Sequence, residues 1–296
     1  MKVGVVVFPG TNCDRDTFSA CEEFGWKVEY IWHNDIRLQL KLGLKQKSRL
    51  GFPAQQQKAK KDLNEIEHKN YLDKFDVIFL PGGFSYGDYI RSGALAKFSP
   101  VITAIKEFVD KKQGFVVGIC NGFQILCECG LLPGALTHNE CLKFICKDVE
   151  LVLKEGKREK EKRNFAFNDS TITTSPLAGE VCFQYEQRLA NIRKQGEGYS
   201  NQSTHSFLTL PIAHAEGRYI ADKETIKQLK KDDMIFLTYK DNPNGSVENI
   251  AGLYDKKRKI IGMMPHPERA FFKETGLLDG KIIFEFIENK LKKAKK

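Results

Sequence analysis

The chain has 296 residues, 41% of them hydrophobic, so it can bury a full core and lies near the upper size for a single one. No run approaches the roughly 18 apolar residues that a membrane span needs, and the apolar start from Met1 to Pro9 is too short for a signal peptide. We therefore expect a cytoplasmic protein in which residues 1–296 form one domain with insertions.

The formal net charge of +9 comes from three basic segments. Nine Lys or Arg oppose three Asp or Glu in residues 37–70, six oppose three in residues 154–163, and five lysines lie in residues 290–296. We interpret these segments as solvated parts of two insertions, about 37–70 and 154–205, and of a tail. Because no interleaved aromatic pattern or binding motif accompanies the charge, nucleic-acid binding is an alternative rather than the main expectation.

The chain carries eight cysteines, which in a long sequence without a secretion signal predict reduced, mostly buried thiols rather than a disulfide framework. Cys127 and Cys129 flank a single glutamate and so invite a metal-site interpretation. No second ligand pair stands at zinc-site spacing, and we expect no metal in this chain.

The first half of the chain alternates short apolar runs with helical patterns. Residues 3–8 (VGVVVF) predict a buried strand, followed by a helix that Asp14 or Asp16 is expected to cap and that ends at Gly25. Residues 28–32 predict a second strand, and residues 76–80 (DVIFL) a third. Helical spacing in residues 102–111 leads to a fourth strand at 114–119 (GFVVGI), and a further helix is expected over 123–129.

This alternation predicts an α/β fold, a doubly wound, mostly parallel open sheet flanked by helices, with functional loops at the carboxyl ends of the strands. The second half is expected to be more β-rich, with strands at 149–153, 206–212, 218–221, 234–239 and 259–264.

Cys120 is the predicted nucleophile. It lies in GICNG (118–122), between an apolar strand and a helical run, which is the layout of a nucleophile elbow. Glycines two residues before and after the cysteine allow a tight strand-to-helix turn, and the start of a helix favours a thiolate. The alternative is that Cys120 is one more buried cysteine in a tight turn.

His266 is the predicted base, with Glu268 as the carboxylate that orients it. The segment MMPHPER (263–269) directly follows the last predicted strand, and two prolines stiffen the backbone around the histidine. A carboxylate two residues further on can accept a hydrogen bond from one ring nitrogen and so fix which nitrogen faces the sulfur.

An oxyanion site is expected from PGGFSYGD (81–88), which follows the third strand. Its glycines let a backbone N–H approach a developing oxyanion, and Asn121 is placed to supply a second N–H. The segment lacks the spacing and the Lys-Ser/Thr ending of a phosphate-binding loop, so a simple glycine turn is the alternative.

Together, GICNGFQ (118–124), PGGFSYGDYIRSGALAKF (81–98) and MMPHPERA (263–270) resemble the class I, triad-type glutamine amidotransferases. The similarity is greatest to the glutaminase subunits of phosphoribosylformylglycinamidine synthases, supported by VVVFPGTNCDRD (5–16), LPGALTHNECLKFICK (132–147), LPIAHAEGRYIA (210–221) and NPNGSVENIAG (242–252). The resemblance covers nearly the whole chain outside the two insertions, which the compact small-subunit form lacks or shortens.

The resemblance implies that Cys120, His266 and Glu268 form a catalytic triad and that the amides of Gly83 and Asn121 form the oxyanion hole. It further implies that Gln124 contacts bound L-glutamine and that the segment from Asn139 to Phe144 holds the amino-acid end of the substrate. No cofactor is implied in this chain. ATP and magnesium are expected on a larger synthase subunit that receives the ammonia, together with a small accessory subunit.

Two other classes of function stay open at this point. A glutaminase that serves a different synthase, or a DJ-1/PfpI-like cysteine hydrolase, shares the strand–cysteine–helix layout. The hydrolases of that second kind typically set a histidine after the cysteine, where this chain has Asn121. A non-enzymatic protein that binds nucleic acid through the basic insertions is the other class.

Overall fold

The computed structural model describes residues 1–35, 37–38, 71–111, 114–154 and 205–294. They form two compact units, unit 1 (Met1–Ala135 with Tyr254–Gly262) and unit 2 (Leu136–Leu253 with Met263–Ala294). Residues 39–70 and 155–204, almost all of the two predicted insertions, lie outside the described part of the chain, as does most of the charge on which nucleic-acid binding depended.

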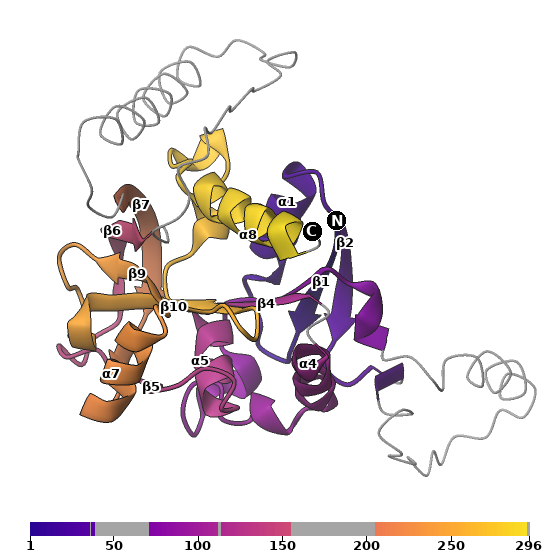
Figure 1. Cartoon of the computed structure of the whole chain (residues 1–296), viewed down its shortest axis with the longest axis horizontal. Helices are drawn as coiled ribbons and strands as arrows, with labels where there is room; N and C mark the ends of the chain where they lie inside the picture. The colour runs from indigo at the N-terminus through magenta and orange to yellow at the C-terminus, as the bar shows by residue number, and fades with distance from the viewer. Residues whose placement is uncertain (36, 39–70, 112–113, 155–204, 295–296) are drawn as a thin grey trace, which may run out of the picture. The chain divides into compact units, whose positions relative to one another are not determined.

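Unit 1 contains the parallel part of the fold (Figure 1). Its strands follow the order β2-β1-β3-β4-β11, and the β1–β2, β1–β3 and β3–β4 pairs are parallel. Helix α1 lies on one face of these strands, and α4 and α5 lie on the opposite face (Figure 1). The elements are β1 (Lys2–Val7), α1 (Asp14–Glu23), β2 (Lys27–Trp32), η1 (Tyr71–Lys74), β3 (Val77–Leu80), η2 (Ser85–Asp88), η3 (Ala96–Phe98), α4 (Pro100–Asp110), β4 (Phe115–Ile119), α5 (Asn121–Glu128) and β11 (Ile260–Met263), whose last residue belongs to unit 2.

The central strands of unit 1 owe their place to continuous apolar sequence. Every residue of β3 and β4 is buried, as expected for parallel strands that helices cover on both faces. Helix α4 starts with Pro100 directly after Ser99 and buries an apolar face that includes Ile105 and Phe108. A proline at the first helical position loses no hydrogen bond, so it sets the start of this helix without cost.

The loops that follow β3 and β4 lie at the same edge of the sheet. Leu80, the last residue of β3, is paired in register with Gly118, one residue before the end of β4. The glycine-rich segment 81–88 and Cys120 therefore leave neighbouring parallel strands at their carboxyl ends, which is the position expected for functional loops.

Unit 2 is built mainly of antiparallel strands. Their order is β10-β9-β6-β7, and the β6–β7, β6–β9 and β9–β10 pairs are all antiparallel, while β5 and β8 form a separate pair. The elements are β5 (Ala135–Thr137), β6 (Ile145–Lys154), β7 (His205–His214), β8 (Arg218–Ile220), α7 (Lys223–Lys231), β9 (Ile235–Tyr239), η4 (Val247–Asn249), β10 (Ile250–Asp255), η5 (Pro267–Arg269), η6 (Lys273–Thr275) and α8 (Gly280–Ala294). The last two residues of β10 and the first of β5 belong to unit 1.

The predicted fold class is confirmed: parallel strands flanked by helices occupy unit 1, and a more β-rich arrangement follows in unit 2. One detail was wrong. Asp14 and Asp16 lie inside the first turn of α1, and the cap position belongs to Cys13, whose side chain makes no capping hydrogen bond. The acidic side chains instead favour the helix start through its dipole.

Within the described residues, no helix has both the length and the apolar character needed to cross a membrane. The cytoplasmic location and the single-domain organisation of residues 1–296 stay predictions.

Candidate functional site

Cys120 occupies a strained turn between β4 and α5. Its backbone has φ 50° and ψ −105°, outside the region that L-residues ordinarily adopt, and its side chain is buried, with a relative exposure of 5% for the residue. The amides of Phe123 and Gln124 donate to the Cys120 carbonyl at 3.0 and 3.1 Å, so the helix starts directly after the cysteine. Such backbone strain concentrates at functional sites because surrounding structure must hold it in place.

The two glycines around Cys120 are needed because the turn leaves no room for side chains. A Cβ at Gly118 would stand 2.6 Å from the carbonyl of Gly122 and from a Leu126 methyl group. A Cβ at Gly122 would stand 1.8 Å from the Leu80 carbonyl oxygen of β3. The elbow predicted from the GxCxG pattern is therefore present, with close packing against the neighbouring strand as its cause.

The glycine-rich loop after β3 is also held in an unusual conformation. Gly83 has φ 139°, and a Cβ there would lie 2.7 Å from the amide nitrogen of Asn12. The loop forms an isolated bridge with Thr11, closed by Phe84 N donating to Gly10 O at 3.0 Å. That bond uses the amide of Phe84, not of Gly83.

The side chain of Asn121 connects this loop to the elbow. Its Oδ1 accepts from the Ser85 amide at 3.2 Å, and its Nδ2 donates to Gln124 Oε1 at 2.9 Å and, at 3.5 Å, to Asp88 Oδ1. Asn121, Gln124 and Ser85 are all buried. Unit 1 thus contains four of the predicted site residues: Gly83, Cys120, Asn121 and Gln124.

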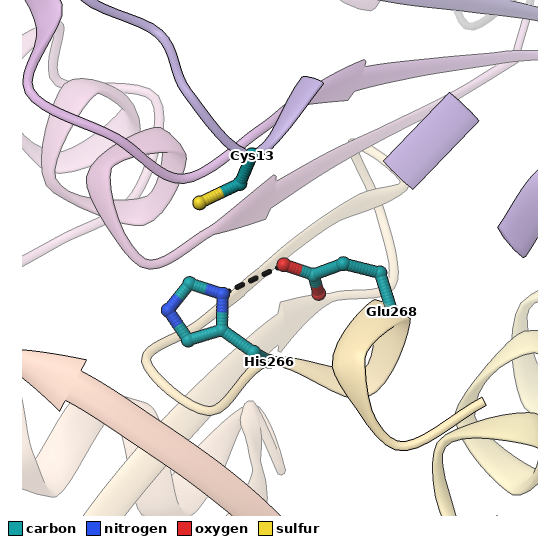
Figure 2. A group of neighbouring side chains, drawn as sticks. All are labelled: Cys13, His266 and Glu268. Carbon is teal, nitrogen blue, oxygen red and sulfur yellow. Dashed lines mark hydrogen bonds and ion pairs between the residues drawn. The ribbon is translucent and has the colours of Figure 1, made fainter. Parts of the chain in front are cut away.

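His266 and Glu268 form a buried pair in unit 2. The ring Nδ1 lies 2.6 Å from Glu268 Oε1, and Figure 2 shows this hydrogen bond. Both side chains are at most 2% exposed. Because a carboxylate can only accept, the bond places the proton of a neutral ring on Nδ1 and leaves Nε2 with the lone pair. This is the tautomer that a general base acting through Nε2 requires.

Backbone contacts fix the position of the His266 loop. The His266 amide donates to Pro211 O of β7 at 2.9 Å, and the Arg269 amide donates to the His266 carbonyl at 3.2 Å. At Gly280, where α8 begins, a Cβ would lie 1.9 Å from the Pro267 carbonyl oxygen. The short η5 helix is thereby packed against α8 without a gap.

Asn139, predicted to bind substrate, is completely buried and fully engaged within unit 2. Its Nδ2 donates to the carbonyls of Lys143 (2.8 Å) and His214 (2.9 Å), and its Oδ1 accepts from His214 Nδ1 (3.0 Å) and from the Gly217 amide (3.2 Å). The side chain shapes the following segment, whose Phe144 is 52% exposed. A substrate contact from this region would have to come from residues after Asn139.

His214 is a buried imidazole that the sequence did not single out. Burial, and to a lesser extent the neighbouring His266, lowers the pKa of His214 to about 4. Its Nε2 has no hydrogen-bond partner among the described residues. The His214 ring thus lies close enough to the predicted base for the two to interact electrostatically.

Cys127 in the last turn of α5 and Cys129 at its C-cap differ from a reactive thiol. Burial raises the pKa of Cys129 to about 11 and that of Cys127 further still. Cys127 Sγ contacts the Pro133 carbonyl at 3.9 Å. Both behave as structural thiols, in contrast to the strained position of Cys120.

The sequence matches known proteins along nearly its whole length. Residues 1–276 match the model of the CobB/CobQ-like glutamine amidotransferase domain. Phosphoribosylformylglycinamidine synthase subunit PurQ of Prochlorococcus marinus (strain NATL2A) is 39% identical over 284 residues, which are 96% of this chain and 97% of the relative. The PurQ protein of a second strain of the same species is also 39% identical, over 98% of this chain and all of the relative.

Solved structures agree with these matches. A chain in the structure of PurLQS from Thermotoga maritima superposes with a TM-score of 0.64 at 32% identity, covering 98% of both chains. A putative GMP synthase protein from Thermoplasma acidophilum superposes with a TM-score of 0.50 over all of this chain and 96% of that chain. At 13% identity, this second likeness supports the fold alone.

Proposed function

Because the chain belongs to the CobB/CobQ-like glutamine amidotransferase family, we propose that it is the glutaminase subunit of a phosphoribosylformylglycinamidine synthase. It hydrolyses L-glutamine to glutamate and ammonia and passes the ammonia to an ATP-dependent synthase subunit in purine biosynthesis. The family match over residues 1–276 favours this interpretation over a DJ-1/PfpI-like hydrolase.

The observation that carries the proposal within the structure is the backbone of Cys120. A buried cysteine held at φ 50° between a strand and a helix is the geometry of a nucleophile elbow. An ordinary core cysteine has no reason to occupy a strained conformation.

In the first half of the proposed reaction, His266 Nε2 takes the thiol proton and the Cys120 sulfur attacks the side-chain amide carbon of glutamine. The electron pair of the carbonyl moves to its oxygen, and the amides of Gly83 and Asn121 donate to that oxyanion. When the oxyanion collapses, the C–N bond breaks and the imidazolium gives its proton to the leaving nitrogen. Ammonia and a γ-glutamyl thioester result.

In the second half, His266 removes a proton from water, and the resulting hydroxide attacks the thioester carbon. The C–S bond breaks, the imidazolium returns its proton to the leaving sulfur, and the new γ-carboxyl group of glutamate loses its proton to solvent on release. Glu268 accepts from Nδ1 throughout, which keeps Nε2 available and stabilises the imidazolium that forms in each half. Gln124 and the segment that follows Asn139, up to Phe144, are proposed to contact the substrate.

The product has value only if a partner receives it, because free ammonia is protonated in bulk water. We propose that the partners are a large synthase subunit and a small accessory subunit, as in the PurLQS relative. ATP and magnesium belong to the large subunit in this proposal.

The test follows glutamate release from glutamine by the chain with and without a candidate synthase. Cys120→Ala should abolish release in the complex, whereas the matched change Cys127→Ala in the following helix, α5, should keep it. A glutamine-mimicking alkylator with mass spectrometry should label Cys120. Appreciable release by Cys120→Ala would overturn the assignment, and activity with a different synthase alone would redirect it to another amidotransferase.

A further inference from the structure

The side-chain amide of Asn121 has an orientation that its partners determine. The Ser85 amide is a donor, so the atom of Asn121 that faces it must be the oxygen. The nitrogen then points to Gln124 Oε1 and Asp88 Oδ1, both acceptors. The bonds to Ser85 and Gln124 are buried and so are made without competition from water, whereas the bond to Asp88 is partly buried.

The loop that Asn121 holds is one that will not keep its shape unaided. Tyr86 (φ 57°), Gly87 (φ 76°) and Asp88 (φ 51°) are consecutive left-handed residues, and a non-glycine residue there costs about 1–2 kcal/mol. Other ties connect the loop to different parts of unit 1: Tyr86 N donates to Pro9 O at 2.6 Å, and the Tyr86 hydroxyl lies 2.9 Å from His33 Nδ1. The side chain of Asn121 ties the loop to the elbow itself.

We propose that the Asn121 side chain is a positioning residue that clamps the glycine-rich loop to the elbow and so fixes the spacing of the two oxyanion-hole amides. One of those amides belongs to Asn121 and the other to Gly83, two residues before Ser85. An oxyanion hole works only when both donors lie about 2.7–3.1 Å from the same oxygen. The effect on catalysis rests on the proposed function, whereas the clamp itself does not.

Asn121→Leu removes the clamp while keeping a side chain of similar size. Removing one oxyanion donor costs about 10²–10³ in kcat, and loosening rather than deleting a donor should cost about 10- to 100-fold. We expect KM to stay within about threefold. Alkylation of Cys120 by iodoacetamide forms no oxyanion, so its rate should also stay within about threefold, whereas a disturbed thiol would slow both reactions.

Exchanging the amide of Asn121 and the carboxylate of Asp88 tests the same contacts, because the second substitution should restore activity that the first one removes. Asn121→Asp keeps an acceptor for the Ser85 amide but sets a second carboxylate against Asp88 and an acceptor against Gln124 Oε1. Adding Asp88→Asn removes one charge and restores a donor between the two side chains. The double variant should therefore have a kcat at least about tenfold higher than that of Asn121→Asp, which corresponds to about 1.4 kcal/mol.

The clamp also has a readout that does not need turnover. Hydrogen exchange of a peptide covering residues 81–88, followed by mass spectrometry on the folded chain, should quicken about tenfold in Asn121→Leu as a hydrogen bond is lost. Asn249→Asp is the matched control, since that side chain is exposed and its oxygen accepts from Asn242 in unit 2. It should leave exchange and kcat within about twofold of the parent.

The inference would be overturned by unchanged exchange in Asn121→Leu, by a kcat of that variant within threefold of the parent, or by no recovery in the double variant. A fall in alkylation parallel to kcat would also overturn it, because the thiol would then be the group affected. If the parent complex fails to hydrolyse glutamine, the proposed function fails instead, and the exchange measurement still decides whether the clamp exists.

Discussion

Replacing Glu268 with glutamine tests the histidine–carboxylate pair with the smallest possible change. The two side chains have the same shape, and both Glu268 and His266 are almost fully buried, so the local packing should survive. An amide oxygen facing Nδ1 keeps the proton on that nitrogen but removes the negative charge. An amide NH₂ facing Nδ1 instead forces the proton onto Nε2, where the ring can no longer accept one from the thiol.

The size of the effect follows from these two orientations. A hydrogen bond to a charged group contributes about 1.5–3 kcal/mol, so losing the charge alone should lower kcat about 10- to 150-fold. If the amide NH₂ faces Nδ1, the ring adopts the wrong tautomer and kcat should fall by about 10⁴-fold, as in the corresponding change in a serine protease triad. This value is the lower limit of the expected activity. KM should change little, because the Glu268 carboxylate bonds to the His266 ring, at 2.6 Å, and is not proposed to contact the substrate.

Glutamate release by the complex with its synthase is the assay, with Glu274→Gln as the matched control because Glu274 is exposed in unit 2. Circular dichroism should show the same thermal transition for both variants within a few degrees. A kcat for Glu268→Gln within threefold of the parent would refute the role of this pair.

Two further predictions concern stability. Gly122→Ala places a Cβ 1.8 Å from Leu80 O. Gly130→Ala is the control, because Gly130 has φ 70° but open space around it, and it should lower the free energy of unfolding by roughly 1 kcal/mol. Gly122→Ala should lower it by about 1–3 kcal/mol or more beyond that value, and equal melting temperatures of the two variants would contradict the packing account. For His214, the unfolded ring takes up a proton near pH 6.5 but the native ring only near pH 4, so stability falls as the pH drops through that window. Between pH 7 and 5 the parent should lose about 2 kcal/mol more of its unfolding free energy than His214→Gln, and equal losses in denaturant titrations would show that the ring is not buried and neutral.

The parallel half of the fold could be predicted because its signals are local. Strands β1, β3 and β4 are short apolar runs that end at Pro-Gly, Pro-Gly-Gly or the elbow, and such runs have few alternatives in an α/β pattern. The same holds for the predicted elbow, where glycine spacing and a strand-to-helix change coincide. The His266–Glu268 hydrogen bond joins residues only two apart, so it too was visible in the sequence.

What the sequence did not reveal depends on contacts between distant residues. Helices α7 and α8 were missed because lysines obscure their apolar faces, although Asp222 caps α7 by accepting from the Thr225 amide at 2.7 Å. The Asn121 side chain meets Ser85 across 36 residues, and Asn139 meets His214 across 75. No periodicity or spacing rule reports such pairs, so the clamp in unit 1 and the structural task of Asn139 needed coordinates.

The distribution of backbone strain in unit 1 gives a reason for this reliance on distant contacts. Tyr86, Asp88 and Cys120 are non-glycine residues at positive φ, and at about 1–2 kcal/mol each they cost some 3–6 kcal/mol, which is comparable with the net stability of a whole domain. Glycine at these positions would relieve most of that cost. A chain that keeps tyrosine, aspartate and cysteine there must hold them by other contacts, and the side chain of Asn121 and the close approach of Gly122 to β3 do so. Strain of this size at the loop and the elbow is what the proposed oxyanion hole beside Cys120 requires, because its two donors must keep fixed positions.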